Sequence, residues 1–283
     1  MIDIIKDTLI DGIKLLPFLF ITYLIMEYIE HKTGNKTQNI VKKSGKFGPL
    51  FGGILGVFPQ CGFSAAAANL YSARIISIGT LIAVFLSTSD EMLPILISES
   101  ASVGLILQIL AIKLVIGVVA GFSVDIITRF INKKKEDNVV ENVSHLCEHE
   151  HCDCEHGIFK SSLKHTLNIF LFIIIITFIL NIGIHLIGEE NISNFITRFP
   201  TVGILICALV GFIPNCASSV IITELYLTNL ISMGAMISGL LVGSGIGMLV
   251  LFKSNKNIKE NLKIAGILYL IGIISGFIIN LVI

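Results

Sequence analysis

The sequence predicts an all-α, polytopic membrane protein whose two halves form an inverted-topology repeat. Composition is the first reason, because 54% of the 283 residues are hydrophobic and only 14% are charged, whereas an average soluble domain has about 25% charged residues. Apolar runs are the second, since residues 167–182, 203–213 and 264–283 approach the roughly 20 residues with which a helix crosses a bilayer. A formal net charge of zero gives no indication of a nucleic-acid partner.

An internal repeat is the third reason. The segment that begins at Gly56 aligns without gaps with the segment that begins at Gly211, at an offset of 155 residues. The identities include Pro59 and Pro214, Cys61 and Cys216, Tyr71 and Tyr226. Small residues recur wherever membrane helices pack closely, but packing alone does not require a matched proline, cysteine and tyrosine. We therefore expect two related halves, residues 1–130 and 161–283, joined by a loop at 131–160.

Each half contains the same order of apolar segments. The first is a span, followed by a proline-interrupted stretch and two further spans. The first half has them at 8–31, 48–70, 75–98 and 102–130, and the second half at 163–188, 203–225, 228–252 and 262–283. We expect the first span to be retained, because it ends in charged residues without the small residues of a signal-peptide cleavage site.

The interrupted stretches either cross the membrane or return as re-entrant hairpins of two half-helices. Crossing would place the basic loops 32–46 and 129–164 on opposite sides, against the tendency of basic loops to be cytoplasmic. Hairpins place both loops, and 16 of the 20 Lys and Arg residues, on the cytoplasmic side. The sequence therefore favours three spans and one hairpin per half. Because three is odd, the halves insert in opposite senses, and about ten helical segments result.

The hairpin tips are candidates for binding an ion. Pro59 and Pro214 interrupt their helices and expose backbone groups that need a partner at that depth. Polar side chains and thiols surround the two prolines, namely Gln60, Cys61 and Ser64 in the first half, and Asn215, Cys216, Ser218 and Ser219 in the second. Sulfur suits soft or borderline cations and oxygen suits harder ones. Either cysteine could instead be a small buried apolar residue.

Acidic residues in apolar segments give a sharper indication. Asp90 and Glu91 lie within the segment 75–98, and a carboxylate inside the bilayer costs several kcal/mol, so it is functional by default. The alternative is a helix end nearer the surface. Lys113 stands alone in the segment 102–130, where it is either a counter-ion for an empty acidic site or a side chain that snorkels to the interface.

Further acids flank the expected pathway. Glu27, Glu30 and His31 end the first span at spacings that share one helix face. They are either an access or proton-relay group or an interfacial cluster at the membrane edge. Glu224 follows the second hairpin, where the first half has Asn69. Several acids facing one cavity would attract cations and repel anions.

The loop between the halves is dense in metal ligands. It contains His145, Cys147, His149, His151, Cys152, Cys154 and His156, interleaved with acids. Tracts rich in His and Cys bind transition metals, although this spacing matches no structural zinc site. We interpret the loop as a flexible collector or sensor of metal, with a solvated linker as the alternative. Capture of metal on the cytoplasmic side favours export.

The residues also resemble a known family. The segments GVFPQCGFS, GFIPNCASS and STSDEM, the EYIEH end of the first span and the His-rich loop are similar to those of the ten-helix heavy-metal exporters, whose members are also labelled manganese transporters or arsenic efflux proteins. The resemblance covers nearly the whole chain and implies a metal-efflux permease. It does not fix the ion, and the acids in the spans argue against an anionic arsenic species.

We therefore expect a secondary transporter that exports a divalent transition-metal ion of the Fe, Mn, Co or Ni class, coupled to protons, because no Walker motif indicates use of ATP. The expected central site comprises Asp90, Glu91, Cys61, Cys216, Gln60 and Asn215. The metal is the substrate and no cofactor is expected. The expected partners are the metal ion and the lipid bilayer of a bacterial inner (plasma) membrane, with no nucleic acid, and a homodimer is left open.

Two other functions stay open. A permease for an organic or oxyanion solute, such as an arsenical, would direct helix amino ends at the anionic group. An intramembrane cysteine hydrolase would need a histidine base near Cys61 or Cys216, and only His185 and His31 lie at comparable depth. The enzyme is the weaker of these alternatives.

Overall fold

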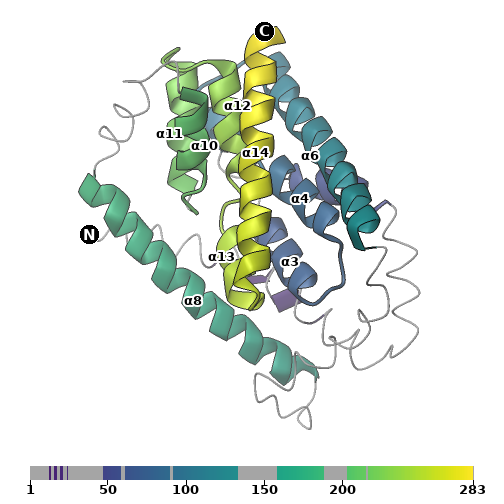
Figure 1. The fold of residues 1–283 in the computed structure, drawn as a ribbon. Coiled ribbons are helices and arrows are strands. Elements are labelled where there is room, and N and C mark those ends of the chain that lie inside the picture. Colours follow the sequence, from purple (N-terminus) through teal and green to yellow (C-terminus); the bar gives the residue numbers. More distant parts are fainter. Residues whose placement is uncertain are drawn as a thin grey trace.

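A computed structural model describes residues 47–58, 61–89, 92–132, 158–187, 203–214 and 216–282, together with six helical positions between 13 and 24 (Figure 1). All regular secondary structure in these residues is helical. The first half contains α2 (Gly48–Gly56), α3 (Cys61–Ser72), α4 (Ile78–Ser87), α5 (Met92–Ser98) and α6 (Val103–Asn132). The second half contains α8 (Ile158–Ile187), α10 (Gly203–Gly211), α11 (Cys216–Leu227), α12 (Met233–Val242), α13 (Gly247–Ser254) and α14 (Ile258–Val282).

The helix bounds repeat along the chain. Each helix from α10 to α14 begins 155 residues after its counterpart among α2 to α6. Local hydrogen bonds repeat with them: the Ser77 hydroxyl caps α4 by accepting from the Thr80 amide, and the Ser232 hydroxyl caps α12 by accepting from the Ala235 amide. A serine at this position satisfies an amide that the helix itself cannot pair. The same local sequence signals thus build the same elements in both halves.

The repeat extends into the last helix of each half, beyond the segment that aligns clearly in sequence. The Gly79 amide donates to Oδ1 of Asp125 at 2.8 Å, and the Gly234 amide donates to Oδ1 of Asn280 at 3.0 Å. Asp125 and Asn280 are themselves 155 residues apart. Asp125 and its amide isostere Asn280 therefore make the same hydrogen bond in the two halves. It joins the start of α4 to the end of α6, and the start of α12 to the end of α14.

The proline-interrupted stretch of the first half is a hairpin. A Cβ atom on Gly48 would touch Thr80, and one on Gly56 would touch Val84 and Ser87, so α2 runs parallel to α4. Helix α3 returns in the opposite direction, because only five residues separate its end from the start of α4. Helices α10 and α12 repeat the close approach, with a Cβ atom on Gly211 lying 2.2 Å from the carbonyl oxygen of Gly239.

Two of the predicted continuous spans are broken. In 75–98, α4 ends at Ser87 and α5 begins at Met92, and in 228–252, α12 ends at Val242 and α13 begins at Gly247. The Thr88 hydroxyl bonds back to the Val84 carbonyl at 2.8 Å, a contact that bends helices. Gly245 has φ of 53°, in the left-handed region that glycine enters without strain.

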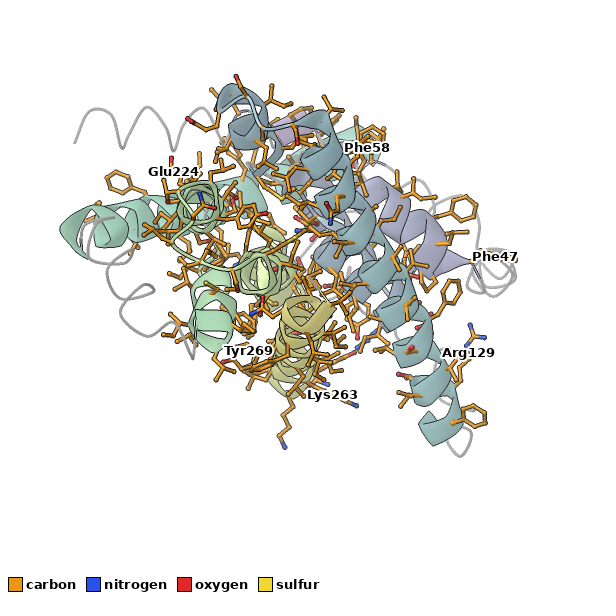
Figure 2. All side chains as sticks on the ribbon, turned by 90° about the horizontal axis from the view of Figure 1, so that it is seen from above. Phe47, Phe58, Arg129, Glu224, Lys263 and Tyr269 are labelled. Atoms are coloured by element: carbon orange, nitrogen blue, oxygen red, sulfur yellow. The ribbon has the colours of Figure 1, made fainter. Side chains whose placement is uncertain are left out.

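The broken spans lie at the centre of the bundle and the continuous ones lie outside. Helices α4 and α12 contact each other, and the apolar segments Ile78–Ser98 and Met233–Ser254 are mostly buried. Helices α6 and α14 are mostly exposed, long enough to cross a membrane, and run in opposite directions in Figure 1. Exposed apolar side chains such as Val115 and Leu270 lie along them, and Figure 2 shows the side chains of the bundle from above. Lipid-facing surfaces have this composition.

Close approach at the hairpins predicts which glycines matter. Gly56→Ala and Gly211→Ala place a Cβ atom 2.6 Å and 2.2 Å from a backbone carbonyl oxygen, so each is expected to destabilise the protein by about 1–3 kcal/mol through overpacking. The control is Gly266→Ala in α14, where no atom lies within 4 Å of the new Cβ. Thermal unfolding in detergent measures the effect. Equal melting temperatures for all three variants would contradict the packing.

Candidate functional site

The first break and the first hairpin tip are tied together. The hydroxyl of Ser89, in the break between α4 and α5, donates to the carbonyl oxygen of Val57 at 2.5 Å. Val57 is the C-cap residue of α2, next to the hairpin tip. Ser89 is 1% exposed, so this contact lies inside the protein. The tie satisfies one of the carbonyls that the end of α2 leaves without a helical partner.

Helix α13 of the second half packs against this part of the first half. A Cβ atom on Gly247, the first residue of α13, would lie 2.8 Å from the Ser64 Cβ and 2.8 Å from the Phe85 ring. The start of α13 therefore packs against the start of α3. The equivalent pair, α5 and α11, is also in contact. We call residues 57–58, 61–64, 88–89 and 243–247 the central junction.

The described donors of the central junction are oxygen and sulfur atoms. Cys61 is the first residue of α3 and is half-buried, and the buried Ser64 hydroxyl donates to its carbonyl at 2.8 Å. Thr88 and Ser89 add buried hydroxyl oxygens. At the equivalent place in the second hairpin, outside the central junction, Pro214 and Ser219 are half-buried, and the buried Ser218 hydroxyl donates to the Ile213 carbonyl at 3.2 Å. These atoms suit hard to borderline cations.

Helix ends set the electrostatics of the central junction. The carbonyl ends of α4 and α12 and the amide ends of α3 and α13 lie at the central junction. Negative and positive partial charges of the helix dipoles therefore lie close together there. Lys113 of α6 is 1% exposed, and its ammonium donates to the carbonyl oxygen of Leu240, in the last turn of α12, at 2.6 Å. The expectation that Lys113 could snorkel to the interface is therefore wrong.

Much of the predicted site falls outside the described residues. This applies to Pro59, Gln60, Asp90, Glu91, Asn215, Glu27, Glu30, His31 and the side chain of Cys216, and to the loop residues His145, Cys147, His149, His151, Cys152, Cys154 and His156. Within the part of the chain that the structure describes, no three His, Cys, Asp or Glu residues gather into a metal cluster. Glu224 is described, and its side chain is exposed on α11 (Figure 2).

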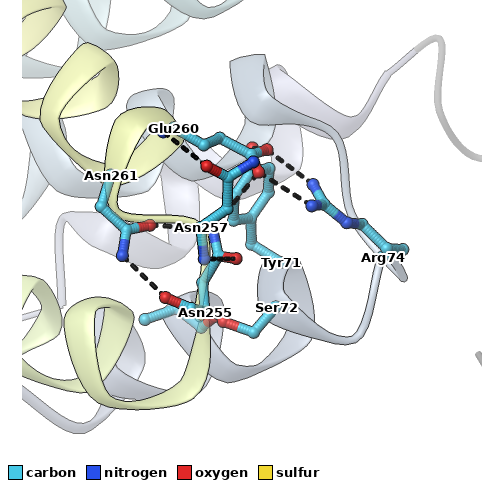
Figure 3. Close-up of polar contacts among 8 residues, drawn as sticks. Tyr71, Ser72, Arg74, Asn255, Asn257, Glu260 and Asn261 are labelled. Carbon is cyan, nitrogen blue, oxygen red and sulfur yellow. Dashed lines mark hydrogen bonds and ion pairs between the residues drawn. The ribbon is translucent and has the colours of Figure 1, made fainter. Parts of the chain in front are cut away.

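A polar network links the halves at one end of the bundle (Figure 3). We call Tyr71, Arg74, Asn255, Glu260 and Asn261 the cross-half network. Arg74 donates to both carboxylate oxygens of Glu260, at 2.6 and 2.8 Å, and the Tyr71 hydroxyl donates to the same carboxylate. The amide of Asn255 donates to Asn261 at 2.8 Å and to Glu260 at 3.4 Å. The hydrogen-bonded Glu260 carboxylate raises the pKa of Arg74 above its usual range.

Two features of this site differ from the sequence prediction or are absent from it. The predicted spans are broken where a Gly-Ser-Gly run at 243–245 and a Ser-Thr-Ser run at 87–89 contain residues of low helix propensity. The cross-half network has no sequence signal, because Arg74 and Glu260 are 186 residues apart and no local pattern relates them.

Comparison with known protein families identifies a match for most of the chain. The sequence model of a family described as "Putative, 10TM heavy-metal exporter" matches residues 1–188. This stretch covers the first half, the middle loop and α8, and so more than half of the 283 residues. No curated protein and no solved structure gives a significant match.

Proposed function

Because the chain belongs to the family of 10TM heavy-metal exporters, we propose that it exports a divalent transition-metal ion of the Fe, Mn, Co or Ni class in exchange for protons. Family and apolar helices make it a multi-pass membrane protein, and the proposed location is a bacterial inner membrane. The metal is the transported substrate, and the middle loop is the proposed cytoplasmic collector.

The observation that carries the proposal is the position of the first break. Asp90 and Glu91 are the two residues that follow Ser89 and precede Met92, and these neighbours are 1% and 0% exposed. This favours a buried acidic pair over a helix end at the membrane surface. In the second half the aligned residues are Gly245 and Ile246. The two carboxylates would thus supply the charge of one cation site.

Oppositely inserted halves are the second part of the proposal. Helix α3 packs on α13 and α11 packs on α5, so each hairpin lies against the half of a broken span that comes from the other copy. The opposite directions of α6 and α14 (Figure 1) support the same arrangement. Inverted repeats of this kind bring broken helices together near the membrane midplane, where transporters bind their substrates.

Coupling to protons follows from the charge of the proposed site. Two carboxylates without a metal ion are costly in a low-dielectric interior, and burial favours their protonated forms. Protons would therefore replace the metal when it leaves. Cys61 and Ser64, at the start of α3, would add a sulfur and an oxygen ligand to the carboxylates. A mixed set of this kind suits borderline divalent ions.

The proposed topology is tested by labelling from one side of the membrane. In a cysteine-free variant, Thr33→Cys and Ser144→Cys are expected to react with a membrane-impermeant maleimide from the same side, because both lie in basic loops. Ser193→Cys, in the segment between α8 and α10, is the control and should react from the opposite side. Labelling of Thr33→Cys and Ser144→Cys from different sides would contradict the re-entrant hairpin.

Transport by the purified protein in liposomes tests the function. Asp90→Asn and Glu91→Gln are expected to lower the flux of Mn²⁺, Fe²⁺, Co²⁺ or Ni²⁺ by about a hundredfold, because each removes a charged ligand. Glu99→Gln, in the exposed turn after α5, is the matched control and should transport normally. Unchanged flux in both acid variants, or transport of arsenite but of no divalent ion, would refute the proposal.

A further inference from the structure

Lys113 is a buried basic residue that has no role in the proposed function described above. It is 1% exposed and lies within the long apolar helix α6, where a charged side chain is expensive and by default functional. Its ammonium donates to the carbonyl oxygen of Leu240 at 2.6 Å. Leu240 is in the last turn of α12, whose carbonyls lack helical partners because the helix ends at Val242.

The register of α6 against α4 places Lys113 beside the first break. Gly121 of α6 packs against Gly79 and Ala83, and Gly117 packs against Ala83 and Ser87, so the two helices are antiparallel. Lys113 lies one turn before Gly117 on the same face of α6, and this is the level of the break that follows Ser87. The Lys113 ammonium thus binds the carbonyl end of α12, in the broken span of the second half. Lys113 itself lies level with the break between α4 and α5 in the first half.

The duplication supplies a natural comparison. The residue of α14 that aligns with Lys113 at the offset of 155 is Leu268, which is 0% exposed. Packing at this position therefore needs only an apolar side chain. The lysine is present only in the copy that has Asp90 and Glu91 in its break. Lys113 and Leu268 therefore differ in charge, whereas both positions accommodate a large buried side chain.

We propose that Lys113 is a positioning residue of the transport site, whose ammonium, fixed at the carbonyl end of α12, balances one carboxylate of the acidic break while no metal is bound, so that protons need to neutralise only the other. The inference rests on the proposed function. A metal-free carrier with unbalanced carboxylates would return slowly, since charge separation in a low dielectric is costly. Exchange of one metal ion for another does not require the metal-free form.

The test compares net transport with exchange in liposomes, using radioactive Mn²⁺. Lys113→Gln keeps a hydrogen-bond donor and removes the charge, and it should lower net transport by about tenfold or more while metal-for-metal exchange stays near the wild-type rate. Lys113→Arg should retain both modes. The matched control Leu268→Met should change neither. Lys113→Met, which fills the volume without a donor, serves as a second neutral variant if Lys113→Gln does not fold.

Each result has one meaning. Wild-type protein that transports no metal refutes the proposed function itself. Wild-type protein that transports metal, with a folded neutral variant whose net transport is normal or whose exchange falls as much as net transport, refutes only the role of Lys113.

The cross-half network carries a second, independent inference. Tyr71 and Arg74 follow the first hairpin, whereas Asn255, Glu260 and Asn261 belong to the turn between α13 and α14. The network therefore closes the contact of α3 with α13 at the end that the lysine distribution assigns to the cytoplasm (Figure 3). The aligned residues at the other end are Tyr226, Asn229, Ser100, Leu105 and Ile106, and apolar Leu105 and Ile106 cannot make the same network.

The geometry points to the cross-half network as a gate that opens during transport to admit metal from the cytoplasm. A bidentate guanidinium–carboxylate pair is strong enough to hold two elements together, and Arg74 is partly exposed, so solvent can separate the pair. Alternating access requires that contacts between the halves at one end break while those at the other end form. This inference also rests on the proposed function.

Cross-linking tests the gate. Joining Arg74→Cys/Glu260→Cys with a bifunctional thiosulfonate, because two side chains of this length hold their Cα atoms farther apart than a direct disulfide bridges, should lower metal transport by about tenfold or more, and reduction should restore it. Charge reversal in Arg74→Glu/Glu260→Arg should transport better than either single reversal, because the pair is re-formed. The matched control is Arg74→Asn, which installs the residue found at position 229 and should remain folded. Undiminished transport by the cross-linked protein would overturn the gate without affecting the proposed function.

Discussion

A helix that is interrupted inside a bilayer leaves carbonyls and amides without partners, and the rest of this structure depends on how they are satisfied. The chain packs the interruptions against one another. Ser89 pairs with the carbonyl of Val57, Lys113 pairs with that of Leu240, and the start of α13 lies against the start of α3. The continuous helices α6 and α14 lie outside, with apolar faces exposed. Among the spans that the structure describes, these two continuous helices are mostly exposed, whereas the two broken spans are mostly buried.

Because each local feature occurs in both halves, a short sequence can specify the buried contact between the interrupted helices. The hydroxyls of Ser77 and Ser232, the left-handed residues Arg74 and Asn229, and the close contacts of Gly56 and Gly211 recur at one offset. Each is a local rule that fixes a cap, a turn or an approach. Two copies obeying the same rules bury their interrupted faces against each other, as neither copy could do alone.

These local rules are also what the sequence could predict. The hairpin segments 48–70 and 203–225 and the spans 102–130 and 262–283 correspond closely to helices, because long apolar periods and a matched proline are visible in the chain. The break in 75–98 was not predicted, since its hydropathy is continuous and the cause is a Thr88 hydroxyl that bonds to the preceding turn. The partner of Lys113 is a backbone carbonyl 127 residues away, and a backbone group leaves no signal in the sequence.

What differs between the copies is charge. Position by position, the first half has Asp90, Glu91, Lys113 and Arg74 where the second has Gly245, Ile246, Leu268 and Asn229. The shared residues build the helices, and the unshared ones of the first half include two acids, a buried lysine and the arginine that pairs with Glu260 of the second half. A symmetric scaffold would offer two equivalent cation sites on either side of its axis. With Asp90, Glu91 and Lys113 in one copy, the proposed cation site is single, and an electrostatic balance that changed as the halves moved would couple the ion to a conformational cycle.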